Sequence, residues 1–295
     1  MGVPMVQCDF LVIGSGVAGL MFALEVAEHG RVAVLCKDEP SEGSTRYAQG
    51  GIATVISPLD SFESHVQDTM DAGAGLCDEE VVRMVVSQGP ERIERLVSLG
   101  AAFDKNKDAE DYELGQEGGH SARRILHARD ATGAEIHRAV FERAERHPNI
   151  TLYPHHVAID LITQPVPGNE SSTEVLGVYA LDRRQSEVVT FVGSVTMLAT
   201  GGAGKVYLYT SNPDVSTGDG IAMAFRAGAA IANMEFIQFH PTCLYHPAAK
   251  SFLITEAMRG EGARLLTADG QPFMEQYDSR GELAPRDVVA RAIDD

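Results

Sequence analysis

A glycine-rich turn near the start of the chain has the residue types and spacing of a phosphate-binding loop. Gly14, Gly16 and Gly19 form a G-x-G-x-x-G pattern. It follows a short apolar run, residues 9–13, and precedes residues 20–29, whose apolar side chains recur at helical spacing. The first glycine permits a tight turn, the second lets a pyrophosphate approach the backbone, and the third lets helix and strand pack closely. Because the helix N-terminus adds free N–H groups, the pattern favours dinucleotide binding over a turn that merely needs glycines.

The residue after the next expected strand, residues 31–36, departs from the usual dinucleotide fingerprint. An acidic residue commonly binds the ribose at this point, but the chain has Lys37, with Asp38 and Glu39 just beyond it. The ribose contact therefore stays open, and we expect Lys37 to approach a phosphate or the adenosine edge.

Two other motifs fit their usual functions poorly. Residues 201–206 resemble a Walker A loop, but Ala199 replaces its first glycine and Val206 replaces the Ser/Thr that would hold Mg²⁺. We interpret this segment as a strand-to-loop turn. The pair His155-His156 lacks metal-ligand spacing and is interpreted as structural. No metal site is expected.

Composition limits the classes of partner. The 295 residues include 24 Lys+Arg and 42 Asp+Glu, a net charge of −18. This acidity disfavours nucleic-acid binding, which needs a basic surface. The net negative charge would also repel an acidic substrate. Such a substrate would therefore have to be bound by arginines and helix N-termini at the site itself. The chain length suits one large domain or two ordinary ones.

The cysteines and the apolar runs indicate in which cellular compartment the protein is expected. Cys8, Cys36, Cys77 and Cys243 are widely spaced and form no C-x-x-C pair, which disfavours a redox or metal-binding dithiol. The N-terminus lacks the pattern of a signal peptide. Since no apolar run reaches the ~18 residues of a membrane span, we expect a cytoplasmic protein without a membrane contact.

Hydrophobic periodicity predicts an α/β fold. Expected helices cover residues 20–29, 81–99, 132–147, 218–228 and 287–293; expected strands cover residues 9–13, 31–36, 150–162, 175–181 and 189–199. Polar loops are expected at residues 40–51 and 105–119. The pattern changes near Glu235, which predicts a domain boundary there.

Eight further segments carry a family resemblance. In chain order they are residues 44–53, 117–121, 123–127, 130–133, 199–202, 216–220, 235–242 and 285–289. Together they resemble the succinate dehydrogenase/fumarate reductase flavoprotein family. The resemblance implies a Rossmann-like FAD-binding domain of the fumarate reductase flavoprotein type, with an inserted α+β capping domain. We expect residues 1–234 to form the FAD-binding domain and residues 235–295 to begin the substrate-capping domain, which would be truncated here.

The resemblance implies FAD as the cofactor and assigns residues to it. Ser44 stands where the respiratory branch of the family has a histidine that carries the flavin covalently, so noncovalent FAD is expected. The implied cofactor-binding residues are Gly14, Ser15, Gly16, Val17, Ala18, Gly19, Lys37, Ser44, Thr45, Gln49, Gly50, Gly51, Val157, Ala199, Thr200, Gly201, Gly202 and Asp219.

Glu117 separates two branches of the family. The segment E-G-G-H-S at residues 117–121 is similar to the branch that oxidises L-aspartate. Aspartate differs from succinate by one ammonium group, with which the Glu117 carboxylate can pair. A charge-assisted hydrogen bond of this kind contributes roughly 1.5–3 kcal/mol, enough to select between the substrates. Without the family context, a solvated surface glutamate would be the simpler interpretation.

Three more residues are implied to bind substrate carboxylates: His240, Thr255 and Arg286. The planar guanidinium of Arg286 suits a carboxylate because it donates two parallel hydrogen bonds. The family also implies a proton-shuttle role at Arg286, although an arginine is a poor base at its ordinary pKa. Without the resemblance, His240 would be interpreted as a core histidine, Thr255 as a helix cap and Arg286 as part of a surface ion pair. Arg286, Glu117 and His240 are the candidate catalytic residues.

The resemblance implies a reaction. FAD-dependent oxidation would convert L-aspartate to iminoaspartate, with oxygen or fumarate as the final acceptor. This is the first step of quinolinate and NAD biosynthesis, in which association with quinolinate synthase is conceivable.

Three alternatives stay open. The first is a soluble fumarate reductase or succinate-oxidising flavoprotein, with Glu117 incidental. The second is a non-catalytic FAD-binding fragment. The third, an NAD(P)-dependent dehydrogenase, rests on the glycine pattern alone and explains neither the A-Q-G-G segment at residues 48–51 nor T-G-D-G at residues 217–220.

Overall fold

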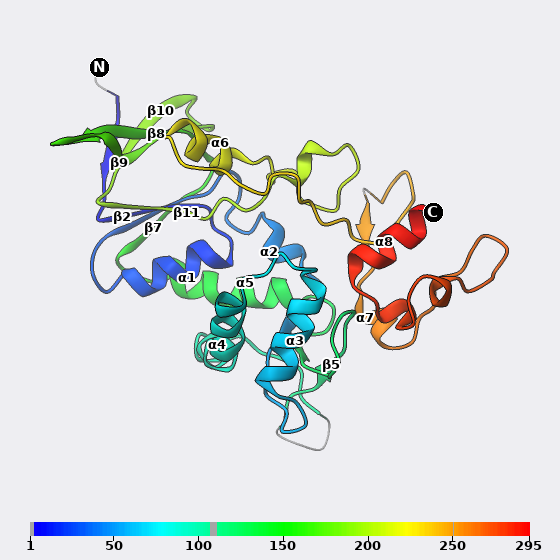
Figure 1. The fold of residues 1–295 in the computed structure, drawn as a ribbon. Helices are drawn as coiled ribbons and strands as arrows, with labels where there is room; N and C mark the ends of the chain where they lie inside the picture. The colour runs from blue at the N-terminus through cyan, green and yellow to red at the C-terminus, as the bar shows by residue number, and fades with distance from the viewer. Residues whose placement is uncertain (1–2, 107–110, 250) are drawn as a thin grey trace. The chain divides into compact units, whose positions relative to one another are not determined.

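The computed structural model describes residues 3–106, 111–249 and 251–295 (Figure 1). The chain divides into two compact units, each made of two separate stretches. The first unit contains Met1–Tyr47 and Ile136–Phe236, and the second contains Ala48–Glu135 and Ile237–Asp295. The division into an FAD-binding domain up to residue 234 and a capping domain after it stays a prediction.

A parallel sheet forms the centre of the first unit. Its strand order is β11 (Val195–Leu198), β2 (Phe10–Ile13), β3 (Val32–Leu35) and β7 (Ile150–Tyr153). Helix α1 (Val17–Val26) connects β2 to β3 and packs against both strands, as the blue helix in Figure 1 shows. The predicted strand–turn–helix–strand unit and its α/β class are confirmed.

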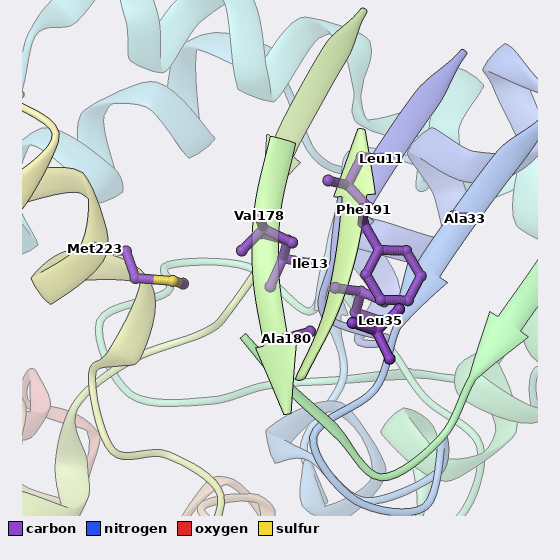
Figure 2. Close-up of a cluster of buried hydrophobic side chains, with 9 residues drawn as sticks. Leu11, Ile13, Ala33, Leu35, Val178, Ala180, Phe191 and Met223 are labelled. Atoms are coloured by element: carbon purple, nitrogen blue, oxygen red, sulfur yellow. The ribbon is translucent and has the colours of Figure 1, made fainter. Parts of the chain in front are cut away.

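A second sheet, mostly antiparallel, covers the other face of the parallel sheet. It contains β1 (Met5–Gln7), β10 (Glu187–Val192), β9 (Asn169–Asp182) and β8 (His156–Val166), in that order. Alternate residues of the strands meet in one apolar cluster, to which α6 (Asp219–Arg226) contributes Met223 (Figure 2). The ring of Phe191 is fully buried there and meets Tyr153 edge-on, with 4.9 Å between ring centroids.

The second unit is mainly helical. It contains α3 (Phe62–Ala72), α4 (Glu79–Ser98), α7 (Ala257–Gly260) and α8 (Arg286–Asp294), and α5 (Thr132–Glu145) begins in it and ends in the first unit. A small sheet has the order β4 (Ile52–Ala53), β6 (Ile125–Leu126) and β5 (Leu114–Gly115), and β12 (Cys243–Leu244) pairs with β13 (Phe252–Leu253). Short 3₁₀ turns occupy Met274–Gln276 and Gly281–Leu283.

Helix caps explain where α3 and α4 begin. The Ser61 hydroxyl accepts from the Ser64 N–H at 3.1 Å, which satisfies one of the first free amides of α3. Asp78 does the same for α4, accepting from the N–H groups of Glu80 and Val81. The sequence predicted α4 from its period but not the shorter α3.

Two expected strands are each divided between the two sheets of the first unit. The run at 150–162 breaks at His155, whose φ of +58° turns the chain from β7 into β8. The run at 189–199 breaks at Gly193 and Ser194, where the chain passes from β10 to β11.

Two expected loops contain short regular elements. The loop at 40–51 includes the single helical turn α2 (Ser44–Tyr47), and the loop at 105–119 includes β5. Residues 107–110 of the second loop lie outside the described residues. In the part of the chain that is described, no helix is both long and apolar enough to cross a membrane.

Removing the Phe191 ring should destabilise the first unit. Phe191→Ala leaves a cavity between its two sheets and should cost about 3–5 kcal/mol in the free energy of unfolding, measured by denaturant titration. Val188→Ala, on the same strand but with 40% of Val188 exposed, should cost less than about 1 kcal/mol. Equal losses for the two variants would contradict this description of the core.

Candidate functional site

A cavity of about 520 Å³ opens at the carboxyl ends of the parallel strands in the first unit. This volume lies within the roughly 300–1,000 Å³ typical of small-molecule sites. The wall combines the glycine-rich turn, the ends of β3 and β11, and the start of α6. Of the expected cofactor residues, the cavity is lined by Gly14, Ser15, Gly16, Val17, Ala18, Lys37, Ser44, Thr45, Ala199, Thr200, Gly201 and Asp219.

The glycine turn leaves no room for side chains at two of its positions. A Cβ on Gly14, whose φ is +117°, would lie 2.2 Å from the Ala199 carbonyl oxygen. A Cβ on Gly19 would lie 2.0 Å from the Gly14 carbonyl oxygen. The turn can therefore pass close to both β11 and its own helix only because these residues are glycines.

The start of α1 offers unsatisfied donors beside this cavity. The Val17 N–H donates to Thr45 Oγ1 at 3.2 Å, while the N–H groups of Ala18 and Gly19 have no hydrogen-bond partner among the described residues. Behind the turn, the His137 ring meets the Ser15 carbonyl oxygen at 3.1 Å through Nε2. Burial lowers the pKa of His137, so the ring braces the turn as a neutral donor. Free amides at a helix N-terminus fit a pyrophosphate.

Lys37 is paired within the cavity wall. Its ammonium contacts the Asp219 carboxylate and the Thr217 hydroxyl, and donates to the Val215 carbonyl oxygen at 3.2 Å. Burial opposes ionisation of Asp219, but the hydrogen bonds from Lys37 and Thr217 outweigh it and lower its pKa. The pair therefore contributes no net charge to the cavity.

A second, smaller cavity of about 220 Å³ lies within the second unit. It is lined by Ala72, Glu117, Gly118, His120, Gln238, Glu256, Pro285, Arg286 and Asp287. These residues come from the end of α3, the turn at 117–120, an extended segment, the residue before α7 and the start of α8. The lining is strongly charged, in contrast to the more apolar first cavity.

Arg286 is held in this cavity by acidic and amide groups. Its Nε donates to Glu256 Oε2 at 2.5 Å, and its Nη1 donates to Gln238 Oε1 at 3.1 Å. Its Nη2 lies 3.9 Å from Glu117 Oε2. With 34% of its side chain exposed, the guanidinium keeps an open side toward the cavity, where a carboxylate could bind.

Glu117 is ionised less readily than an ordinary glutamate. Burial and the nearby Glu256 carboxylate raise its pKa, while Arg286 and the Gly51 backbone N–H oppose that shift. Glu256 itself is only 3% exposed; it accepts from the Gly118 N–H at 3.1 Å and pairs with Arg259 at 3.2 Å. The lining thus holds the carboxylates of Glu117, Glu256 and Asp287 and the guanidinium of Arg286, while Arg259, which does not line the cavity, pairs with Glu256.

Residues 9–295 match the family model described as an FAD binding domain. The chain belongs to the FAD binding domain family. FAD is therefore its cofactor, and the free amides of α1 and the glycine cradle in the first cavity fit the pyrophosphate of this cofactor. Contacts of individual residues with FAD stay predictions.

Named relatives cover nearly all of this FAD binding domain. The chain is 56% identical over 292 residues to an L-aspartate oxidase of Vibrio cholerae, covering 98% of this chain and 54% of that protein. It is 55% identical over 296 residues to a chloroplastic L-aspartate oxidase of Arabidopsis thaliana, covering 97% of this chain and 45% of that protein. The chain thus spans about half the length of these relatives.

The fold resembles that of a solved quinol fumarate reductase. An E. coli quinol fumarate reductase superposes with a TM-score of 0.91 at 30% identity, over 98% of this chain and 50% of that one. The expected fold, a Rossmann-like FAD-binding domain of the fumarate reductase flavoprotein type, is thereby confirmed.

The remaining expected cofactor residues do not line the first cavity. Gly19 packs behind the turn, Val157 lies on β8 between two lining residues, and Gly202 follows the lining residue Gly201. Gln49, Gly50 and Gly51 belong to the second unit. The Gln49 Oε1 atom is buried there without a hydrogen-bond partner among the described residues, so it could accept from a ligand.

The expected substrate residues separate into two groups. Glu117 and Arg286 line the small cavity together, whereas His240 and Thr255 do not line it. His240 is close enough for Arg286 to lower its pKa, an effect second to burial. The Thr255 hydroxyl accepts from the Ala257 N–H at 3.4 Å, while the N-cap position of α7 is occupied by Glu256.

Among the residues that line the small cavity, Glu256, Gln238 and His120 had no predicted role. Glu256 follows Thr255 directly, and no role was predicted for it. A signal existed in its spacing from Arg259, since residues three apart meet on a helix, but such pairs are common on surfaces.

The motifs interpreted as structural have ordinary partners. Gly204–Val206 is a 3₁₀ turn, and Lys205 pairs with Asp214 at 2.8 Å. His155 contacts Glu39 at 2.9 Å, and His156 lies 3.9 Å from Asp182. No group of three metal-ligating side chains occurs among the residues that the structure describes.

Neutralising Glu256 should lower the pKa of Glu117. Glu256→Gln removes a buried negative charge beside Glu117, so Glu117 should ionise at lower pH, as measured by ¹³C NMR titration of its carboxyl group. Glu261→Gln is the control, because the Glu261 side chain is 63% exposed. A Glu117 pKa that rises or stays unchanged in Glu256→Gln would contradict the described coupling.

Proposed function

We propose that this protein oxidises L-aspartate to iminoaspartate with FAD, and that oxygen or fumarate is the final electron acceptor. The observation that carries the proposal is the presence of a carboxylate, Glu117, and an open guanidinium, Arg286, in one cavity. An amino dicarboxylic acid has the opposite charges in the same compact space. The names of the relatives support the same substrate.

Arg286 binds a substrate carboxylate in this proposal. The guanidinium fork makes two parallel hydrogen bonds to a carboxylate, and Glu256 and Gln238 fix its plane through Nε and Nη1. A positioned cation of this kind attracts a dianion locally, although the chain carries a net charge of −18. His240 and Thr255 are proposed as further carboxylate contacts, on the resemblance alone.

Glu117 selects the amino acid. Its carboxylate accepts hydrogen bonds from the substrate ammonium, which succinate lacks. Because the Glu117 carboxylate is mostly buried, with 13% of its side chain exposed, an ionised Glu117 without a cationic ligand is poorly solvated. Pairing with the ammonium removes this cost, so the site favours aspartate.

When bound, FAD would supply the redox chemistry by taking up a hydride equivalent from the substrate Cα, while the substrate amino group loses the proton that formation of the C=N bond requires. The protein residues orient the substrate and manage its charge. The product is proposed to enter quinolinate and NAD biosynthesis, in which association with quinolinate synthase is an additional proposal. Cytoplasmic localisation stays a prediction, since the Arabidopsis relative is named chloroplastic.

A soluble fumarate reductase or succinate-oxidising flavoprotein is the second candidate. The close superposition on an E. coli quinol fumarate reductase favours it. In that case Arg286 would still bind a carboxylate, and Glu117 would have no ligand ammonium to bind. The raised pKa of Glu117 would then favour its neutral form beside a dicarboxylate more than that of an ordinary glutamate.

Anaerobic reduction of bound flavin tests the proposal directly. L-Aspartate added to the FAD-loaded protein should bleach the flavin absorbance, while succinate should not. Bleaching by succinate alone would replace the proposal with the second candidate. In Glu117→Gln, the preference for aspartate over succinate should fall by roughly 10- to 100-fold, the equivalent of losing one charge-assisted hydrogen bond.

Aspartate binding should also weaken as the pH falls. Glu117 must be ionised to pair with the ammonium, and its raised pKa moves the loss of charge to a higher pH than for an ordinary glutamate. The apparent KM for L-aspartate should therefore rise on acidification before other carboxylates titrate. Glu117→Gln should abolish that rise, measured by steady-state assays across pH. The same profile in the variant would assign the pH dependence to another group.

A further inference from the structure

Arg124 is a fully buried arginine in the second unit, held by two aspartates. Its Nε and Nη2 donate to the two carboxylate oxygens of Asp60 at 2.8 and 2.7 Å, and its Nη1 donates to Asp68 at 2.6 Å. Nη2 also donates to the Ser64 hydroxyl at 3.0 Å. A bidentate pair plus a second carboxylate fixes the guanidinium in one orientation.

The remaining contact of this guanidinium is with His120. Arg124 Nη1 lies 3.4 Å from His120 Nδ1. An arginine can only donate hydrogen bonds, so Nδ1 has to be the unprotonated, accepting nitrogen. A proton on Nδ1 would also face a full positive charge. The neutral ring therefore carries its hydrogen on Nε2.

His120 Nε2 is the free nitrogen of a ring that lines the small cavity. The residue lines this cavity with Glu117 and Arg286. Among the described residues, no hydrogen-bond partner contacts Nε2, and Nε2 is not one of the buried atoms left without a partner. A donor that is accessible and unpaired thus stands beside the groups assigned to the substrate.

The backbone around His120 is fixed on both sides. Ser121 donates to Asp68 at 2.8 Å from both its N–H and its hydroxyl, and Gln116 Nε2 donates to the His120 carbonyl oxygen at 2.8 Å. Asp68 therefore anchors the turn and the guanidinium together, so that the ring and Arg124 keep one relative position.

His120 remains neutral in these surroundings. Burial and the Arg124 charge lower its pKa, while Asp68, Glu256 and Asp60 act in the opposite direction. The His65 ring packs edge-on against it, with 5.6 Å between centroids. Burial, Arg124 and His120 lower the pKa of His65 to about 4, so His65 adds no charge near neutral pH.

We propose that His120 contacts the substrate, donating its Nε2 hydrogen to a carboxylate oxygen, and that Arg124 with Asp60 and Asp68 is the positioning group that sets this tautomer. An N–H donor can bind a substrate carboxylate but not an ammonium. His120 and Glu117 would therefore bind different groups of the same substrate. Because the ring is neutral, it adds a directional hydrogen bond without adding charge to the cavity. The substrate identity rests on the proposed function; the tautomer does not.

Amide substitutions of His120 test the substrate contact. Gln can place an N–H near the position of Nε2, whereas Asn places one near Nδ1 and Ala places none. With L-aspartate and the FAD-loaded protein, Ala and Asn should raise KM about 10-fold, the loss of one hydrogen bond to a charged acceptor. Gln should stay within about 3-fold of the original protein. The exposed His29→Gln is the matched control.

This series of variants distinguishes a His120 that contacts the substrate from a His120 that only stabilises the fold. If Gln and Asn raise KM equally, or if all three variants lower thermal stability while KM stays unchanged, His120 is structural and the proposal is overturned. If aspartate fails to reduce the flavin of the unsubstituted protein while succinate does so, the proposed function fails. The same variants are then measured with succinate, whose carboxylates should show the same ranking.

The tautomer is measured independently of turnover. In FAD-loaded protein labelled with ¹⁵N-histidine, the His120 signals are those missing from the spectrum of His120→Gln. They should show a hydrogen on Nε2 and a bare Nδ1 at neutral pH. A hydrogen on Nδ1, or a doubly protonated ring, would overturn the role assigned to Arg124.

Discussion

The cost of burying charge governs the arrangement of the second unit. Each ionised group there needs a partner of opposite charge, because an unpaired buried charge is strongly destabilising. Arg124 meets this need with Asp60 and Asp68, and Glu256 meets it with Arg259 and Arg286. These two networks border the same small cavity through His120 and Arg286. The cavity thus receives its polar groups already oriented, and the substrate would not have to order them.

A different constraint shapes the first unit, where the backbone itself forms the site. The tight approach of Gly14 to Ala199 depends on the parallel pairing of β2 with β11. That pairing exists because the chain crosses from one sheet to the other at Gly193. The apolar cluster around Phe191 holds the two sheets together. A packing defect far from the glycine turn can therefore change the geometry of the free amides at the start of α1.

Local patterns predicted the parts of the structure that depend on local physics. The glycine turn, α1 and α4 follow from spacing and caps within a few residues. The division of the run at 189–199 into β10 and β11 could not be predicted, since only sheet pairing decides where a continuous apolar segment leaves one sheet for another. Glu117 and Arg286 came from the family resemblance. For Glu256 the only local signal was its spacing from Arg259, which is also common on surfaces, because its role depends on its burial beside Arg286, 30 positions away in the chain.

The pairing of Lys37 with Asp219 leaves hydrogen bonds from backbone amides, and not a free lysine charge, as the interaction available to the cofactor pyrophosphate. A lysine that faced the pyrophosphate alone would make binding depend on attraction between free charges, which dissolved ions screen. Here the ammonium is already neutralised within the wall, and the free donors are backbone amides at the start of α1. Hydrogen bonds from fixed dipoles act over short distances, where ions do not intervene. Raising the ionic strength should accordingly not weaken the binding of FAD, since the salt screens only the repulsion between the acidic chain and the pyrophosphate.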